Sequence, residues 1–201
     1  GPASVSHSSS VLMALMAPGP AFGDSVKWLG GNGNWAQASK WTGGTVPHSS
    51  IVSVLIDDDP ATHSAVVVDG TAIAAGLTLG AGDSLTVRRD GFSGDLYVYG
   101  PLLNDGNIFL QAGTTLQARG GSVTGSGAVV LQSASISDIT SLGRNQSIRG
   151  YGFINAGSGS SGPQSFQNNG LIRAEGGEVA LGMGTTGQRV DNAGGILQIA
   201  N

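Results

Sequence analysis

The stretch Leu103-Asn104-Asp105-Gly106-Asn107-Ile108 contains a pattern that returns four more times downstream: Asn or Gly, any residue, Gly, any residue, then Ile or Val. The later copies lie at 125–129, 150–154, 168–172 and 192–196. Their second glycines are Gly106, Gly127, Gly152, Gly170 and Gly194, which recur at broadly similar intervals. The chain is therefore expected to be a repeat protein with a period of about twenty residues.

Short apolar runs and Gly-rich turns at this spacing predict a parallel β-solenoid, in which one coil holds about three strands and their bends. Side chains alternate within the copies. The inward ones are Ile108, Leu110, Val129, Leu131, Ile172 and Ala174, and Phe109, Val130 and Arg173 point outward between them. We predict an all-β fold, a single-stranded right-handed parallel β-helix of about six or seven coils. Hairpins of an antiparallel sandwich, the alternative, do not explain one signal per period.

The Asn and Gly of the pattern have separate roles at the bend before the strand. Asn tolerates left-handed backbone and can hydrogen-bond along the stack to the next coil. Gly fits where a positive φ is required. We therefore expect an internal ladder that contains Asn104, Gly106, Asn168, Gly170, Asn192 and Gly194.

Composition excludes several kinds of partner. The chain has 201 residues, with 9 Lys and Arg against 13 Asp and Glu, and its net charge is −4. This balance, without a basic block, argues against nucleic acid and anionic membranes as partners. The absence of Cys excludes disulfides and Cys-based metal sites, and it is compatible with export.

The segment 1–23 differs from the rest of the chain. Gly1-Pro2 resembles the pair left by a tag-cleaving protease, and 11–17 is an apolar run followed by Pro, Gly and small residues, as in a signal peptide. The run is too short to span a bilayer, so no membrane span is predicted. The alternative is a short helix that covers the open end of the solenoid. We assign residues 1–23 to the pair left by tag cleavage followed by a signal-peptide remnant or an N-terminal cap. We assign residues 24–201 to one β-helix that is part of a longer protein.

The stretch after this segment carries a family resemblance. Trp28-Leu29-Gly30-Gly31-Asn32-Gly33-Asn34-Trp35, followed by Ala38-Ser39-Lys40-Trp41 and by Val46-Pro47, resembles the opening of bacterial surface β-helix proteins. These include autotransporter passenger domains and related exported repeat proteins. The resemblance covers about residues 26–201 and departs at Ile51, where such sequences often have Asp. It implies an exported protein at the cell surface, associated with the outer membrane or extracellular.

Two groups of aromatic residues are candidates for function. Trp28, Trp35 and Trp41 lie close together in the sequence and are expected to pack as an irregular first turn that closes the core. The alternative is an exposed platform on which sugar rings stack. Further along, Arg88 and Arg89 precede Tyr97 and Tyr99, which face solvent if Leu96 and Val98 face the core. These four residues could contact a glycan or a protein, although Tyr is also a favoured residue at exposed strand positions.

Metal and cofactor sites are not predicted. The acidic run at 57–59 could attract Ca²⁺, but it lacks the alternate acids and central Gly of a calcium loop, which favours a solvated turn. His48 and His63 are isolated, which argues against zinc.

The acids are scattered along the chain, whereas glycoside hydrolysis or β-elimination needs convergent groups. We therefore predict no catalysis, but an exported structural or adhesive module of a bacterial cell-surface or secreted protein. The alternatives are a polysaccharide-degrading β-helix enzyme and a glycan-binding module. The expected partners are the chain itself through the ends of the solenoid, the rest of a larger surface protein, and glycans.

Overall fold

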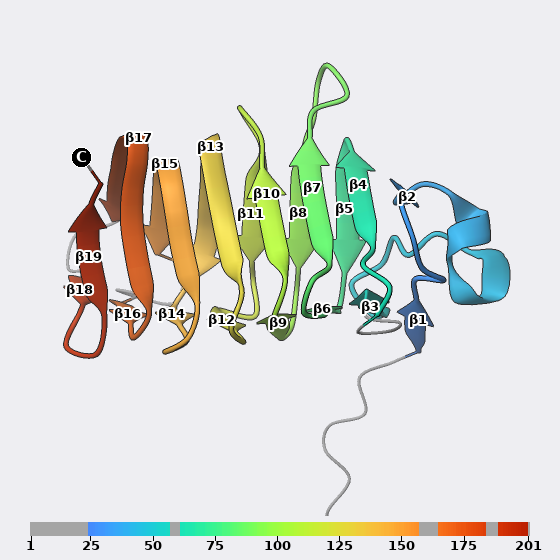
Figure 1. Cartoon of the computed structure of the whole chain (residues 1–201), viewed down its shortest axis with the longest axis horizontal. Coiled ribbons are helices and arrows are strands. Elements are labelled where there is room, and N and C mark those ends of the chain that lie inside the picture. Colours follow the sequence, from blue (N-terminus) through green and yellow to red (C-terminus); the bar gives the residue numbers. More distant parts are fainter. Residues whose placement is uncertain (1–23, 57–60, 157–164, 184–188, 201) are drawn as a thin grey trace, which may run out of the picture.

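The computed structural model describes residues 24–56, 61–156, 165–183 and 189–200. Every strand pair among them is parallel, and the strands form three faces of one solenoid (Figure 1). This confirms the predicted parallel β-helix and excludes the antiparallel sandwich. The segments 1–23 and 57–60, with the expected signal remnant or cap and the acidic run, lie outside the described residues.

The first face is one sheet of short strands, one from each coil. Its order is β1 (Ser25–Lys27), β3 (Ser53–Ile56), β6 (Gly76–Leu79), β9 (Leu102–Asn104), β12 (Ser122–Thr124), β14 (Ser141–Leu142), β16 (Ser165–Asn168) and β18 (Arg189–Asp191).

The second and third faces share some strands, because three long strands pass around the bend between them. The second face contains β2 (Gly33–Asn34), β4 (Ala65–Asp69), β7 (Ser84–Arg88), β10 (Asn107–Leu110), the first halves of β13 (Ala128–Ile139), β15 (Ser147–Ala156) and β17 (Leu171–Met183), and β19 (Ile196–Ile199). The third face contains β5 (Thr71–Ala74), β8 (Asp95–Val98), β11 (Thr115–Ala118) and the second halves of β13, β15 and β17.

The winding is right-handed, as predicted. In Figure 1, β4, β7 and β10 rise on the near side, β5, β8 and β11 descend behind them, and successive coils advance from right to left. This is the hand that parallel crossover connections strongly prefer. From β3 to β17 the described residues make about six coils.

The core consists of columns of apolar side chains, one from each coil. Ile108 pairs in register with Leu85 on one side and Val129 on the other, and all three are fully buried. The predicted inward residues Leu110 and Leu131 are buried too, while Phe109 and Val130 point outward and are half-buried. Complete burial of a Leu, Ile or Val side chain stabilises a fold by about 1.5–3 kcal/mol, so these columns are a main source of stability.

The third copy of the sequence motif does not lie where its spacing predicted. Ile148, and not Ile154, continues the column after Val129, because Ile154 lies on the third face. The glycines of this copy, Gly150 and Gly152, lie inside β15 with φ of 107° and 146°. They mark the bend between the second and third faces, whereas the other copies mark the bend before the second face.

The fifth copy is displaced by one residue. Leu197 pairs in register with Ile172, whereas Ile196 is 61% exposed. The column therefore runs through Ile108, Val129, Ile148, Ile172 and Leu197, and each member follows the one before it by about one predicted period. The predicted period is correct on average, although two of the assigned positions were wrong.

The N-terminal end of the solenoid is closed by the three tryptophans. They lie next to two short 3₁₀ helices, η1 (Ala38–Lys40) and η2 (Thr42–Gly44). Trp28, Trp35 and Trp41 are 0%, 4% and 1% exposed, and Trp41 packs edge-on against both of the other rings at 4.9 Å. This burial confirms their packing role and contradicts the exposed sugar platform.

Candidate functional site

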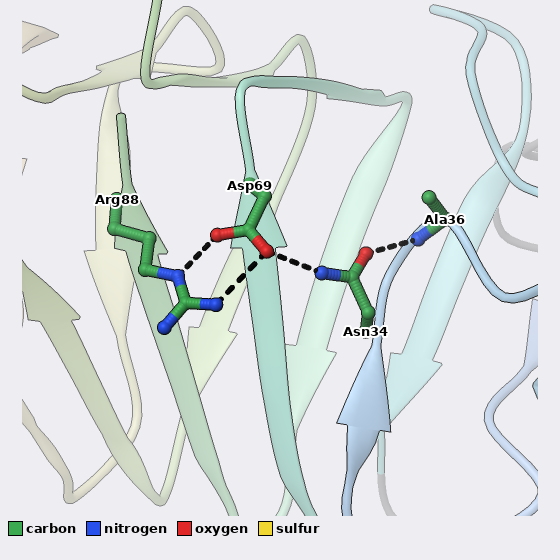
Figure 2. Close-up of polar contacts among 4 residues, drawn as sticks. All are labelled: Asn34, Ala36, Asp69 and Arg88. Carbon is green, nitrogen blue, oxygen red and sulfur yellow. Dashed lines mark hydrogen bonds and ion pairs between the residues drawn. The ribbon is translucent and has the colours of Figure 1, made fainter. Parts of the chain in front are cut away.

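Arg88 is bound to a neighbouring coil and does not lie free for a ligand (Figure 2). It is in register with Asp69, and its Nε and Nη2 donate to the two carboxylate oxygens, Nη2 over 3.0 Å. Asn34 donates from Nδ2 to the same carboxylate over 2.6 Å and accepts from the Ala36 amide over 2.9 Å. The network joins the first turn to the following two coils on the outside of the second face.

The contact between Arg88 and Asp69 shifts the pKa values of both side chains. The hydrogen bond from the Arg88 guanidinium holds the pKa of Asp69 below its usual value, although burial acts in the opposite direction. The Coulomb attraction of Arg88 and the bond from Asn34 also lower this pKa. The same contact raises the pKa of Arg88.

Replacing Arg88 with Gln is expected to raise the pKa of Asp69 toward its usual 3.8. A depressed carboxylate pKa contributes stability that is fully present above the unfolded-state pKa and is lost as pH falls through the lower folded-state pKa. As pH falls through the range between these two pKa values of Asp69, the free energy of unfolding should therefore decrease less in the variant than in the unmodified chain. Carboxyl NMR titration and urea unfolding across the acid range measure both effects; an unchanged Asp69 pKa would contradict the ion pair.

Arg89 stabilises the turn that follows β7. Its Nη2 donates to the carbonyl oxygen of Phe92 over 3.0 Å, and Asp90 accepts from the amides of Phe92 and Ser93 over 3.2 Å each. These main-chain donors lower the pKa of Asp90. Phe92, at the tip of this turn, is 95% exposed.

Tyr97 and Tyr99 point outward from the strand β8 and its end, as predicted, but their partner is Arg119. The Cζ atom of Arg119 lies 5.1 Å from the centroid of the Tyr97 ring and 4.8 Å from that of Tyr99. Its Nη1 donates to the Tyr99 hydroxyl over 2.7 Å, and its Nε and Nη2 donate to Oε1 of Gln117 over 3.2 and 3.0 Å. Cation–π contacts of this kind are worth about 0.5–1 kcal/mol at exposed sites.

We call Tyr97, Tyr99, Gln117 and Arg119 the Arg119 cluster. The sequence predicted the two exposed tyrosines but not Arg119. Arg119 follows β11 as Tyr99 follows β8, and Ala118 is in register with Val98. Residues one coil apart are therefore the spatial neighbours, whereas Arg88 and Arg89 are close to the tyrosines only along the chain.

The predicted Asn ladder is present as two separate contacts. Asn168 donates from Nδ2 to Oδ1 of Asn192 over 2.6 Å. Asn104 donates to the Ala128 carbonyl over 3.1 Å and to Oε1 of Gln146 over 3.3 Å. Gln146, which the sequence pattern missed, is 1% exposed and donates back to the Asn104 carbonyl oxygen.

The glycines of the ladder allow close stacking of the coils. At Gly106 and Gly170, a β-carbon would lie closer than 3.0 Å to main-chain oxygens of the preceding coil. At the fifth copy, a β-carbon on Gly194 would meet Asn169, and one on Gly195 would meet Asn168. Both glycines of this copy therefore lie close to the coil before them.

The described carboxylates mostly hold turns and adjacent coils together. Asp83 accepts from the Ser64 amide over 2.7 Å, and Asp105 accepts from both the amide and the hydroxyl of Ser126 over 2.8 Å. Within the described ranges no group of three or more His, Cys, Asp or Glu side chains could hold a metal ion. None of the helices in the same ranges combines the length and apolar character needed to cross a membrane.

The C-terminal coil differs from the N-terminal end, because its apolar residues are exposed. Leu197 and Ile199 on β19 are 51% and 79% exposed. Beside them lies an open cavity of about 240 Å³, lined by Ile172, Ala174, Val179, Leu181, Leu197, Gln198 and Ile199.

Comparisons with known proteins give no family. No protein-family model, no curated protein and no solved structure matches the chain. Any function must therefore be argued from the fold and the side chains.

Proposed function

We propose that the chain is an exported structural or adhesive module, part of a bacterial cell-surface or secreted protein that is outer membrane-associated or extracellular. The Trp-rich opening, which resembles that of exported β-helix proteins, supports this location. The module extends a rigid stack of coils and presents its long faces to glycans or to neighbouring surfaces.

One observation carries the structural role: where the described carboxylates have partners, these are largely the solenoid's own backbone and arginines. Asp83 and Asp105 bond to adjacent coils, Asp90 holds a turn, and Asp69 links two coils through Arg88. A hydrolase or lyase instead needs carboxyl groups that converge on a substrate. These four acids contribute to the rigidity of the coil.

Glycan binding is the second candidate, and the Arg119 cluster favours it. Arg119 lies over the rings of Tyr97 and Tyr99 and is a cation without a carboxylate partner among the described residues. Arginine and tyrosine are enriched at recognition surfaces.

A binding assay run beside a reducing-sugar release assay tests the proposal. The full chain is incubated with immobilised neutral and acidic polysaccharides and with bacterial cells. Retention without release of reducing ends is the expected result. Turnover that disappears on changing one acidic residue would establish an enzyme and overturn the proposal.

Among the described residues, self-association is proposed through the C-terminal coil. The tryptophan cluster covers the opposite end, whereas β19 exposes Leu197 and Ile199 beside an unpaired strand edge. Exposed apolar edges of this kind promote association.

Sedimentation velocity should therefore detect oligomers whose fraction rises with concentration. Ile199→Lys should return the chain to monomer, because it places a charge on the apolar edge. Phe92→Lys is the control, since Phe92 is also highly exposed but lies in a turn far from β19. A monomer at every concentration would contradict this proposal.

A further inference from the structure

We propose that the third face binds an extended acidic polysaccharide, held at one end by the Arg119 cluster and at the other by a second group of arginine and aromatic side chains, where β15 bends onto this face. The inference deepens the proposed adhesive role and rests on it. The third face lies on the far side in Figure 1.

The second group is Arg149, Tyr151 and Phe153, which we call the Arg149 cluster. Arg149 is exposed on the second face, immediately before the bend, whereas Tyr151 lies at the bend and Phe153 lies on the third face. Tyr151 and Phe153 are 38% and 56% exposed. The inward positions between them are Gly150 and Gly152. Large exposed side chains at three successive outward positions are not needed to bury the core.

Tyr151 packs against the next coil. A β-carbon on Gly177 would lie 2.8 Å from Cβ of Tyr151 and 3.0 Å from its Cγ. Tyr151 therefore packs directly against a glycine of β17, and any larger residue there would displace the ring.

Arg149 is an exposed cation that lies opposite a second cation. It is in register with Arg173 on the adjacent strand, and like charges directly opposite each other destabilise a sheet. Glu175 lies 3.1 Å from Arg173 and compensates that charge, whereas Arg149 forms no ion pair within the described ranges. A ligand that continues from the third face around the bend would relieve the repulsion, because one of its anionic groups would lie beside these two guanidinium groups.

At the other end, some N–H donors of Arg119 form no hydrogen bond within the protein. A guanidinium has five N–H donors, and the bonds to Tyr99 and Gln117 use three of them. Two donors remain for the oxygens of a carboxylate or sulfate group. Since this chain has a net charge of −4, an acidic ligand must be attracted by such local cations.

Short polar side chains connect the two clusters. Phe153, Ser135, Thr115 and Asp95 are in register across four adjacent strands, and Gln117 and Ser137 lie in the next row. The strands β8 and β15 are three steps apart, which is about 14 Å at the usual strand spacing. The two arginines are also displaced along the strands, because Arg119 follows β11 whereas Arg149 precedes the bend of β15. The floor between the aromatic rings has hydroxyl and amide groups, with one carboxylate, that of Asp95, which accepts from the Tyr97 hydroxyl over 3.5 Å. Such a surface fits an extended sugar chain of several units whose acidic groups lie at the arginines. A protein interface would instead have a buried apolar centre.

The test uses calorimetric titration of the full chain with a hexamer of galacturonic acid, and with maltohexaose as the neutral probe. We expect binding of the acidic hexamer that weakens as salt rises. Arg119→Gln and Arg149→Gln should each reduce the affinity about tenfold, since each removes charge-assisted hydrogen bonds. Arg144→Gln is the matched control, because Arg144 is exposed outside both clusters, and it should leave the affinity unchanged.

Ligand length distinguishes one bridging ligand from two separate sites. A galacturonic acid dimer is too short to reach both clusters, so it should bind more weakly and respond to only one of the two arginine variants. Equal affinity for dimer and hexamer, or equal losses in the Arg144 variant, would overturn the inference. So would retention by a protein partner that requires the same residues while the hexamer does not bind. Release of reducing ends would overturn the proposed function alone.

Discussion

Trp41→Ala is expected to lower the free energy of unfolding by about 3–5 kcal/mol, the usual loss for a buried aromatic residue. Trp41 is 1% exposed and packs edge-on against Trp28 and Trp35, each at 4.9 Å. Its Nε1 donates to the Trp35 carbonyl over 2.7 Å. The substitution therefore creates a cavity, removes two ring contacts and leaves a buried carbonyl without its donor.

Urea unfolding followed by the fluorescence of the remaining tryptophans measures this loss. In a solenoid each coil contacts only its neighbours, so the first coils should fray before the rest. Amide exchange should thus be faster in β3 and β4 than in β13. Phe92→Ala is the control, because it removes an aromatic ring that is 95% exposed, and it should change stability by less than about 0.5 kcal/mol. Equal losses in the two variants would mean that the cluster does not cap the core.

The architecture could be predicted because one coil repeats one signal, but the exact columns could not. Each coil has three strands and several bends, so a Gly-x-Gly pair followed by Ile can mark more than one of them. Ile148 and Ile154 both alternate with outward residues, and only the register with Val129 shows which of them continues the column. Contacts across coils, and not local pattern, decide this choice.

Contacts between adjacent coils also explain why the partners of Arg88, Tyr97 and Tyr99 were not predicted. Arg88 and Asp69 are 19 residues apart, Arg119 and Tyr99 are 20 apart, and Ser126 and Asp105 are 21 apart. Each pair joins adjacent coils, so a search for partners one period away would have found Arg119 and would have assigned Arg88 to Asp69. Gln146 was harder to find, because it contacts Asn104 across 42 residues, which is two coils.

Gly127→Ala is expected to destabilise the chain by about 3 kcal/mol, the upper end of the usual cost of overpacking. Its β-carbon would lie closer than 3.0 Å to the carbonyl oxygens of Gly106 and Asn104 in the preceding coil. Both oxygens already accept hydrogen bonds between the coils, from Ala128 over 3.0 Å and from Gly127 itself over 2.9 Å. Neither can move away without weakening this parallel stacking.

Gly176→Ala separates this steric effect from backbone strain. Gly176 has a φ of +73°, but nothing lies within 4 Å of its β-carbon position, so its substitution should cost only the strain of left-handed backbone, about 1–2 kcal/mol. The two variants are compared by their urea midpoints at equal slope. A smaller loss at Gly127 than at Gly176 would show that the coils can separate at this bend. A larger loss at Gly127 is the expected result, because the recurrent Gly is there to allow main-chain atoms of stacked coils to approach each other.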